Sequence, residues 1–345
     1  MSAPSLLLAV PNVSEGRDAS VVQAIGRAFA TGGARLLDVH SDPDHHRSVY
    51  TLAGPSSALS DALMAGAGEA VSRIDVLSGP SSGEPRGEHP YVGALDVAPI
   101  VYLDERSRGA ACAQALVLAD RIGHELEVPV FLYGELTGTE RGHPARLSAA
   151  RPSRPACVPV TMPAGSASTR AQLRAGGVAG LAQRMASGEL MPDFGPVRLH
   201  PRAGATLVAA RAPLVAFNLV LARPAKIDDA RRIAALIRET GAEGLPGLRA
   251  IGVQLGDGLV QVSMNVERPF QTPLALVVER VRAHVEVAHG ELVGLAPSAA
   301  FVDFPADLPL PGFDPTTHLI EHALGLAARL TGPNRLSDAD AGREQ

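Results

Sequence analysis

The order in which strand and helix patterns follow one another constrains this chain most, because the same order occurs twice. Short apolar runs indicate strands, and apolar residues that recur every three or four positions indicate helices. The first half reads strand, helix, strand, strand, helix, strand over 6–11, 19–30, 35–40, 48–53, 57–71 and 97–103. The second half repeats this order over 214–221, 227–240, 248–255, 259–266, 273–288 and 292–295, with Gly256, Asp257 and Gly258 forming a tight turn in its middle hairpin.

This order is that of the split β-α-β-β-α-β unit of ferredoxin-like folds, in which two helices cover one face of an antiparallel sheet. We therefore predict an α+β protein with two ferredoxin-like subdomains, over residues 1–190 and 191–304. A helix over 110–126 and a strand over 128–133 extend the first subdomain, and 137–177, rich in Pro, Gly and Ser, forms a surface excursion. Residues 305–345 form a linker, a helix over 316–330 and a tail.

Composition excludes several classes of protein. The chain has 345 residues, 46% of them apolar, which is enough to bury a sizeable core. A net charge of -5 provides no positive field for nucleic acid or anionic lipid, so we expect neither partner. No apolar run approaches the length of a membrane span, and Pro11 ends the first run too early for a signal peptide, so we expect a cytoplasmic protein. Two cysteines, Cys112 and Cys157, lack the spacing of a zinc site.

One apparent catalytic motif does not survive inspection. Gly79 to Gly83 matches G-x-S-x-G, the nucleophile elbow of α/β hydrolases. That elbow requires a helix immediately after the serine, and Pro85 and Pro90 prevent one. A polar loop is the better interpretation.

The loop that follows the second strand is dense in side chains of the kind that bind metals: Asp38, His40, Asp42, Asp44, His45, His46 and Arg47. A divalent metal is one interpretation. A turn in which Asp42 and Asp44 bond their own backbone beside Pro43 is favoured over it. A third interpretation uses these groups to hold a charged substrate.

His89 lies between Glu88 and Pro90, just ahead of a buried strand that begins near Asp96. Proline on its C-terminal side prevents a regular helix, so the imidazole belongs to a loop at the end of a strand, where catalytic groups are common. A histidine that ties down a turn and a general acid/base with carboxylate neighbours are equally compatible with this pattern.

Arginines accompany a loop in the second half that Gly and Pro stiffen. Arg198 and Arg202 lie inside it and Arg211 follows it, each able to bind a carboxylate through two hydrogen bonds. An acidic ligand is the natural inference, although solvated surface arginines are common in a chain this rich in Arg.

Taken together, several short segments resemble the formiminotransferase family. They are Val10-Pro11-Asn12-Val13-Ser14-Glu15-Gly16-Arg17, Leu37-Asp38-Val39, Arg47-Ser48-Val49-Tyr50-Thr51, Gly87-Glu88-His89-Pro90, Gly93-Ala94-Leu95-Asp96-Val97, Pro192-Asp193-Phe194-Gly195-Pro196, Gly204-Ala205-Thr206, Ala216-Phe217-Asn218, Gln261-Val262-Ser263 and Leu292-Val293-Gly294-Leu295. Spread over roughly the first 300 residues, they are far more specific than any single motif.

The resemblance implies transfer of a formimino group from N-formimino-L-glutamate to N5 of tetrahydrofolate in histidine degradation. It also implies two ferredoxin-like subdomains with a ligand cleft between them, a homodimer, tetrahydrofolate as cosubstrate and no metal. His89 matches the family's catalytic histidine. The segment assigned to folate binding corresponds to Gly195, Pro196, Val197, Arg198, Leu199, His200, Pro201, Arg202, Ala203 and Gly204. Some members carry a cyclodeaminase domain, and this chain ends too soon to contain one, which implies a stand-alone transferase.

The chemistry fits the residue types. An amine attacks an amidine carbon, and one imidazole titrating near neutrality can remove a proton from the entering nitrogen and return it to the leaving one. We assign this role to His89. Asp42, Glu88 or Asp96 can orient the cationic amidinium, and Arg47, Arg198 or Arg202 can bind the glutamyl carboxylates.

Two alternatives remain open. A transferase that uses N-formyl-L-glutamate or 5-formyltetrahydrofolate fits as well, because formyl and formimino groups are nearly isosteric. A non-catalytic folate-binding protein is the second. Relatives often have Arg where this chain has Tyr91 and Asn where it has His46, and both changes bear on substrate anchoring.

Overall fold

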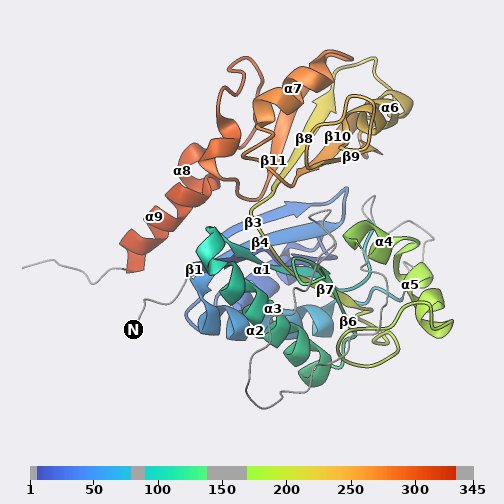
Figure 1. Cartoon of the computed structure of the whole chain (residues 1–345), viewed down its shortest axis with the longest axis vertical. Helices are drawn as coiled ribbons and strands as arrows, with labels where there is room; N and C mark the ends of the chain where they lie inside the picture. Colours follow the sequence, from blue (N-terminus) through green and yellow to red (C-terminus); the bar gives the residue numbers. More distant parts are fainter. Residues whose placement is uncertain (1–5, 79–89, 138–168, 332–345) are drawn as a thin grey trace, which may run out of the picture.

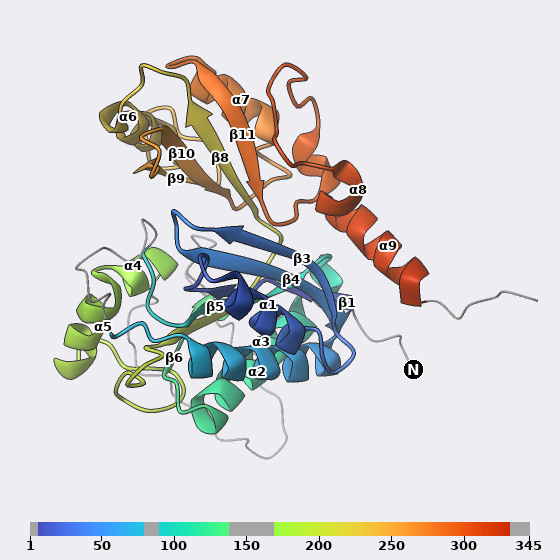
Figure 2. The same cartoon turned by 180° about the vertical axis from the view of Figure 1, so that it is seen from behind.

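Two β-sheets with helices on their outer faces build the molecule, as a computed structural model that describes residues 6–78, 90–137 and 169–331 shows (Figures 1 and 2). The layers run from helices through the first sheet to the second sheet and its helices. Each sheet therefore turns one face towards its own helices and the other face towards the opposite subdomain. The predicted α+β architecture with two repeated units is confirmed.

The first sheet contains seven strands within the described residues. A break at Val10 and Pro11 divides the first strand into two short ones, which both lie between the same neighbours. This core pairs antiparallel, as predicted. Its strands are β1 (Leu6–Ala9), β2 (Asn12–Val13), β3 (Arg35–Asp42), β4 (Arg47–Pro55) and β5 (Leu95–Tyr102).

Two parallel strands extend this sheet beyond β5. β6 (Val130–Gly134) was predicted, but β7 (Thr206–Arg211) was not; β7 inserts between β5 and β6 and pairs with both in parallel. β7 therefore belongs by its pairing to the first sheet, although it lies beyond the predicted boundary at residue 190. The subdomains separate instead in the short connection between β7 and β8 (Val215–Leu221).

Three helices cover the outer face of the first sheet: α1 (Ala19–Phe29), α2 (Ser56–Arg73) and α3 (Arg108–Glu125), the last preceded by a 3₁₀ turn over Glu105–Ser107 (Figure 2). α1 starts where Asp18 accepts hydrogen bonds from the N–H groups of Ser20 and Val21, which satisfies donors that a helix start leaves open. Because side chains alternate along a strand, Leu7 and Ala9 pack under these helices while Leu8 faces the other way.

The end of the predicted excursion is structured. α4 (Arg170–Arg174) opens with a capping box between Thr169 and Gln172, and α5 (Gly177–Ala186) follows it. Leu181 and Met185 pack on the face of β6 and β7 that lies opposite α3. These helices thereby cover one part of the sheet's inner face.

The second sheet has the order β11-β8-β10-β9, entirely antiparallel, as the repeat predicts. Its hairpin turns at Gly258, whose φ of 80° suits glycine, while the N–H of Leu259 bonds to Asp257. The predicted last helix ends six residues earlier than expected, because Val287 to Val293 pairs with β8 as a full strand. The elements are α6 (Ile227–Ile237), β9 (Leu248–Gln254), β10 (Val260–Val266), α7 (Leu274–Arg282) and β11 (Val287–Val293).

The C-terminal segment reaches back across both subdomains. After a 3₁₀ turn over Ser298–Phe301, the predicted single helix is divided into α8 (Pro315–His318) and α9 (Ile320–Thr331). Leu319 between them is extended, because the backbone of Ala296 bonds to His318 and Ile320. Ile320 and Ala323 then pack with Leu8 and Val101 on the inner face of the first sheet. In the part of the chain described here, no helix combines the length and apolar character that a bilayer span requires.

Packing between α1 and α2 depends on Gly66. A Cβ atom built there would lie 2.1 Å from the ring of Phe29, which is fully buried. We expect Gly66→Ala to lower the free energy of unfolding by about 1–3 kcal/mol, because the ring has no room to move in a packed core. Chemical denaturation monitored by circular dichroism measures this change in the free energy of unfolding.

Gly68 in the same helix is the matched control. Its Cβ would lie 3.8 Å from Leu126, which is an ordinary contact. Gly68→Ala should therefore raise the free energy of unfolding by up to about 1 kcal/mol, because alanine has the higher helix propensity. Equal stability of the two variants would contradict this account of the helix contact.

Candidate functional site

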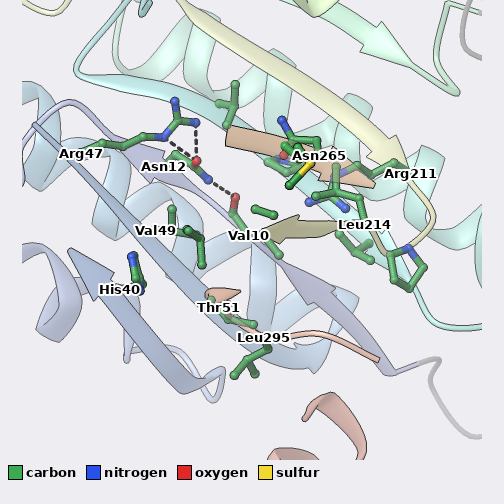
Figure 3. Close-up of a pocket in the computed structure, with 18 of the residues that line it drawn as sticks. Val10, Asn12, His40, Arg47, Val49, Thr51, Arg211, Leu214, Asn265 and Leu295 are labelled. Carbon is green, nitrogen blue, oxygen red and sulfur yellow. Dashed lines mark hydrogen bonds between the residues drawn. The ribbon is translucent and has the colours of Figure 1, made fainter. Parts of the chain in front are cut away.

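A cavity of about 1100 Å³, counted to its open mouth, lies between the inner faces of the two sheets (Figure 3). Strands β1 to β5 form one wall and β8, β10 and the end of β11 form the other, with α4 at one side. Most of its lining is apolar. The ionisable side chains on its wall are His40, Asp42, His45, Arg47, Arg170, Arg174 and Arg211.

Asn12 and Arg47 form a fixed pair on the wall. Arg47 opens β4 and donates from Nε to Oδ1 of Asn12 at 2.8 Å, and its terminal nitrogen donates to the same oxygen. Asn12 donates in turn from Nδ2 to the carbonyl of Val10 at 2.8 Å, at the break between β1 and β2 (Figure 3). The break therefore turns the Asn12 amide towards Arg47 and holds the guanidinium in one plane.

Asp96 lies behind this wall and is 1% exposed. One carboxylate oxygen accepts the N–H of Val92 at 2.9 Å, and the other pairs with Arg174 and lies 3.6 Å from Arg47. Burial and the nearby charge of Arg174 lower the pKa of Arg47 to about 9, against the opposing effect of Asp96. Both arginines remain cations at neutral pH.

A second pair lies at the turn between β3 and β4. Asp42 caps the turn, since its Oδ1 accepts the N–H groups of Asp44 and His45 at 2.8 and 3.0 Å. Its Oδ2 lies 2.5 Å from Nδ1 of His45, whose side chain is 8% exposed. On the other side of the ring, Nε2 lies 3.3 Å from the amide nitrogen of Gln261 on β10. This pair thus bridges the two subdomains.

The contact between Asp42 and His45 shifts the pKa of both side chains. Burial lowers the pKa of His45, but the hydrogen bond and charge of Asp42, together with the charge of Glu291, outweigh it and raise the net value above 6.5. Burial raises the pKa of Asp42, and the hydrogen bonds from His45 outweigh this and lower the net value. The pair is therefore favoured as imidazolium and carboxylate.

The cavity has an uneven distribution of charge. Arg170, Arg174 and Arg211 gather on the side formed by α4 and the end of β7. His40 lies on the β3 side, 3.7 Å from Glu291, which accepts a hydrogen bond from Asn218. Figure 3 places His40 and Arg211 at opposite sides of the cavity. The arginine side suits a carboxylate and the acidic side suits a cation.

Comparison with known proteins identifies the family. Residues 6–152 match the family model described as formiminotransferase domain, N-terminal subdomain. Glutamate formimidoyltransferase of Streptococcus pyogenes is 34% identical over 304 residues, which cover 85% of this chain and 90% of that protein. The chain belongs to the formiminotransferase family.

Two further relatives agree with this membership. Glutamate formimidoyltransferase of Thermoplasma acidophilum is 33% identical over 334 residues, 94% of this chain and 99% of that protein. Formimidoyltransferase-cyclodeaminase of Gallus gallus is 36% identical over 310 residues, which make up 51% of that longer protein. The resemblance predicted from the sequence segments is thereby confirmed.

Of the residues predicted to form the site, Asp42 and Arg47 lie on the cavity wall and Asp96 lies directly behind it. His89 and Glu88 lie outside the described residues. The described chain resumes at Pro90, and Val92 is held by Asp96.

The predicted folate segment, 195–204, does not line this cavity. It packs instead between α3 and the chain around Gly93, where Ala203 accepts the N–H of Ala94. His200 ties the loop by accepting the N–H of Ala203 at 2.9 Å. Arg198 is exposed, and Arg202 lies 3.4 Å from Asp75, just before the undescribed residues 79–89. The assignment of residues 195–204 to folate binding stays a prediction.

Several cavity residues were not predicted. Asn12 lies inside a matched segment, and a polar residue after Pro11 in a buried strand was a usable signal. His45 was seen only as part of a dense loop. Arg174 had no local signal, since it belongs to a segment of weak periodicity. Among the described residues, no three His, Cys, Asp or Glu side chains gather as metal ligands would.

Removal of the Asp96 charge should destabilise the fold, because two buried arginines lose the carboxylate that lies beside them. We expect Asp96→Asn to lower the free energy of unfolding by about 3–5 kcal/mol, because Arg174 is left buried without its partner. Denaturant unfolding measures this loss. Asp104→Asn, in an exposed ion pair with Arg106, is the control and should leave the midpoint unchanged. A midpoint for Asp96→Asn close to that of wild type would show that the buried pair contributes little.

The stability contributed by the Asp42–His45 pair should depend on pH. Because the pKa of His45 is raised on folding, its contribution is complete below about pH 6.5 and is lost as pH rises through the folded value. Because the pKa of Asp42 is lowered on folding, its contribution is present above the unfolded value and is lost as pH falls through the folded value.

We therefore expect His45→Gln to cost more unfolding free energy at about pH 5.5 than at about pH 9. Unfolding titrations at both pH values test this, with His124→Gln on the exposed face of α3 as the control. A larger cost at the higher pH would reverse the assigned direction.

Proposed function

We propose that this chain transfers the formimino group of N-formimino-L-glutamate to N5 of tetrahydrofolate, giving 5-formiminotetrahydrofolate and L-glutamate. The observation that carries the proposal is the 34% identity to a glutamate formimidoyltransferase over 90% of that protein. The cavity between the sheets supports it, because both reactants carry glutamyl carboxylates and the cavity wall carries four arginines.

The reaction makes two demands on the site. The amine and the amidine must be held together, and a cavity between two subdomains brings groups from both walls around them. The tetrahedral intermediate must lose a proton from the entering nitrogen and gain one on the leaving nitrogen. We assign this proton transfer to His89, which lies shortly before Val92 in the chain, the residue whose N–H is held by Asp96.

The remaining assignments follow from charge. Arg47 is held rigidly by Asn12, so it can present a guanidinium edge to a substrate carboxylate. Glu88 orients the cationic amidinium, because both oxygens of Asp42 are held by its own turn and by His45. Asp96, which pairs with Arg174, acts by fixing the arginines rather than by touching the amidinium. Residues 195–204, with Arg198 and Arg202, are proposed to contact folate.

Family membership extends the proposal to the biology of the chain. Tetrahydrofolate is the cosubstrate and no resident metal is required. The reaction belongs to histidine degradation, and the protein works as a cytoplasmic homodimer. Neither nucleic acid nor a membrane takes part.

An assay with both donors tests the function. Purified protein is incubated with tetrahydrofolate and either N-formimino-L-glutamate or N-formyl-L-glutamate, and the folate products are followed by mass. We expect product from the formimino donor. Product from the formyl donor alone would favour the formyl transferase, and folate binding without product would favour a binding protein.

His89→Ala tests the assigned proton transfer within this assay. We expect folate affinity to be kept and turnover to fall by about 10²- to 10⁴-fold, as for removal of a general acid/base. Equilibrium folate binding serves as the control for folding. Turnover equal to that of wild type would remove His89 from the mechanism.

A further inference from the structure

The Asp42–His45 pair has the construction of an acid–base group. The Asp42 carboxylate is fixed by two backbone N–H groups, so it holds Nδ1 of His45 from behind. The opposite nitrogen, Nε2, faces β10 of the second subdomain, and both side chains line the cavity. Nε2 lies 3.3 Å from the side-chain nitrogen of Gln261, an amide that must turn its oxygen towards Nε2, or move aside, when the ring is protonated. A carboxylate that holds Nδ1, with Nε2 at the cavity wall, orients a histidine for proton transfer.

The charges around His45 favour its protonated form. Asp42 on the same turn and Glu291 on β11 stabilise the imidazolium, while Arg47 at the start of β4 opposes it. Gln261 on β10 is 1% exposed and carries no charge. This setting raises the pKa of His45 above its ordinary value and so favours the imidazolium, which is the form that a general acid needs.

We propose that His45 is a second acid–base residue of the transfer, which protonates the departing glutamate nitrogen while Asp42 acts as its positioning residue. This rests on the proposed function and goes beyond it, because it divides the two proton transfers between two histidines.

The step balances as follows. N5 of tetrahydrofolate forms a bond to the amidinium carbon, and its proton passes to His89. The bond from that carbon to the glutamate nitrogen then breaks, and its electron pair takes the proton from Nε2 of His45. The lone pair on the remaining amino group restores the C=N bond. Solvent returns the proton from His89 to His45, so no net proton is consumed.

Steady-state kinetics of the full-length protein across the pH range test this role. Wild type, His45→Gln, Asp42→Asn and the exposed control His124→Gln are assayed with N-formimino-L-glutamate and tetrahydrofolate. We expect His45→Gln to lower kcat by about 10²- to 10⁴-fold with little change in either KM, and free imidazole to restore part of it. His124→Gln should match wild type.

The pH profile separates a catalytic role from a structural one. If His45 acts as an acid, kcat falls as pH rises through its pKa. Asp42→Asn removes a charge that raises this pKa, so the fall should move to lower pH. If His45→Gln does not fold, His45→Asn and Asp42→Asn carry the test.

The outcomes are distinguishable. A wild-type chain that forms no product overturns both the proposed function and the role of His45. A wild type that turns over, with a His45→Gln variant of equal kcat, overturns only the role of His45. A variant that loses affinity for substrates, with the pH profile unmoved and no response to imidazole, shows a structural link between the subdomains and also overturns it.

Discussion

The carboxylate of Asp96 is the interaction on which the rest of the site depends. A carboxylate that is 1% exposed requires partners for both oxygens, and here they come from three separate parts of the chain. Val92 supplies a backbone N–H, α4 supplies Arg174, and β4 supplies Arg47. Because the arginines line the cavity, one buried charge fixes cations on its wall and the chain that follows residue 89. Loss of this charge would therefore disturb the arginines of the cavity wall and the backbone at Val92 together.

The cavity exists because two sheets built on the same β-α-β-β-α-β unit turn the faces without their own helices towards each other. A ferredoxin-like unit has helices on one face only, so its other face must be covered by something else. α5 covers one part of the first sheet and α9 another, and the second sheet stands over the remainder. Polar side chains from both walls then meet across the gap, as His45 and Gln261 do. The site is thus a consequence of how the repeated units pack.

Local sequence patterns predicted most of the strands and helices. The elements that they missed depend on pairing between distant parts of the chain. Period-2 and period-3.6 patterns located the strands and helices of both repeats, and Gly256 to Gly258 located the hairpin, because these signals are local. β7 was missed because its partners, β5 and β6, lie more than 70 residues earlier in the chain. Parallel strands are not joined by a tight turn, so no local turn signal indicates one. Arg174 was missed for the same reason, since only the folded chain brings it to Asp96, 78 residues away.

Motifs located Arg47, Asp42 and Asp96, and geometry explains what each does. Asp96 looked like a partner for the amidinium, but its oxygens are occupied by Val92 and the arginines. The metal interpretation of the loop at 38–46 looked plausible because of its ligand types, yet Asp42 uses both oxygens on its own turn and on His45. The sequence showed which residue types could form the site. It did not show which partner forms the hydrogen bond or ion pair with each of them.

Charge within the cavity also constrains the direction in which the reactants enter. Carboxylates are favoured beside Arg170 and Arg211, and a cation is favoured on the β3 side, where Glu291 lies 3.7 Å from His40. A donor with a carboxylate at one end and an amidinium at the other therefore has one favourable orientation, since the reverse orientation places like charges together at both ends. In that orientation the carbon to be attacked lies towards β3 and the turn that carries His45. Orientation and proton supply then follow from the same few charges.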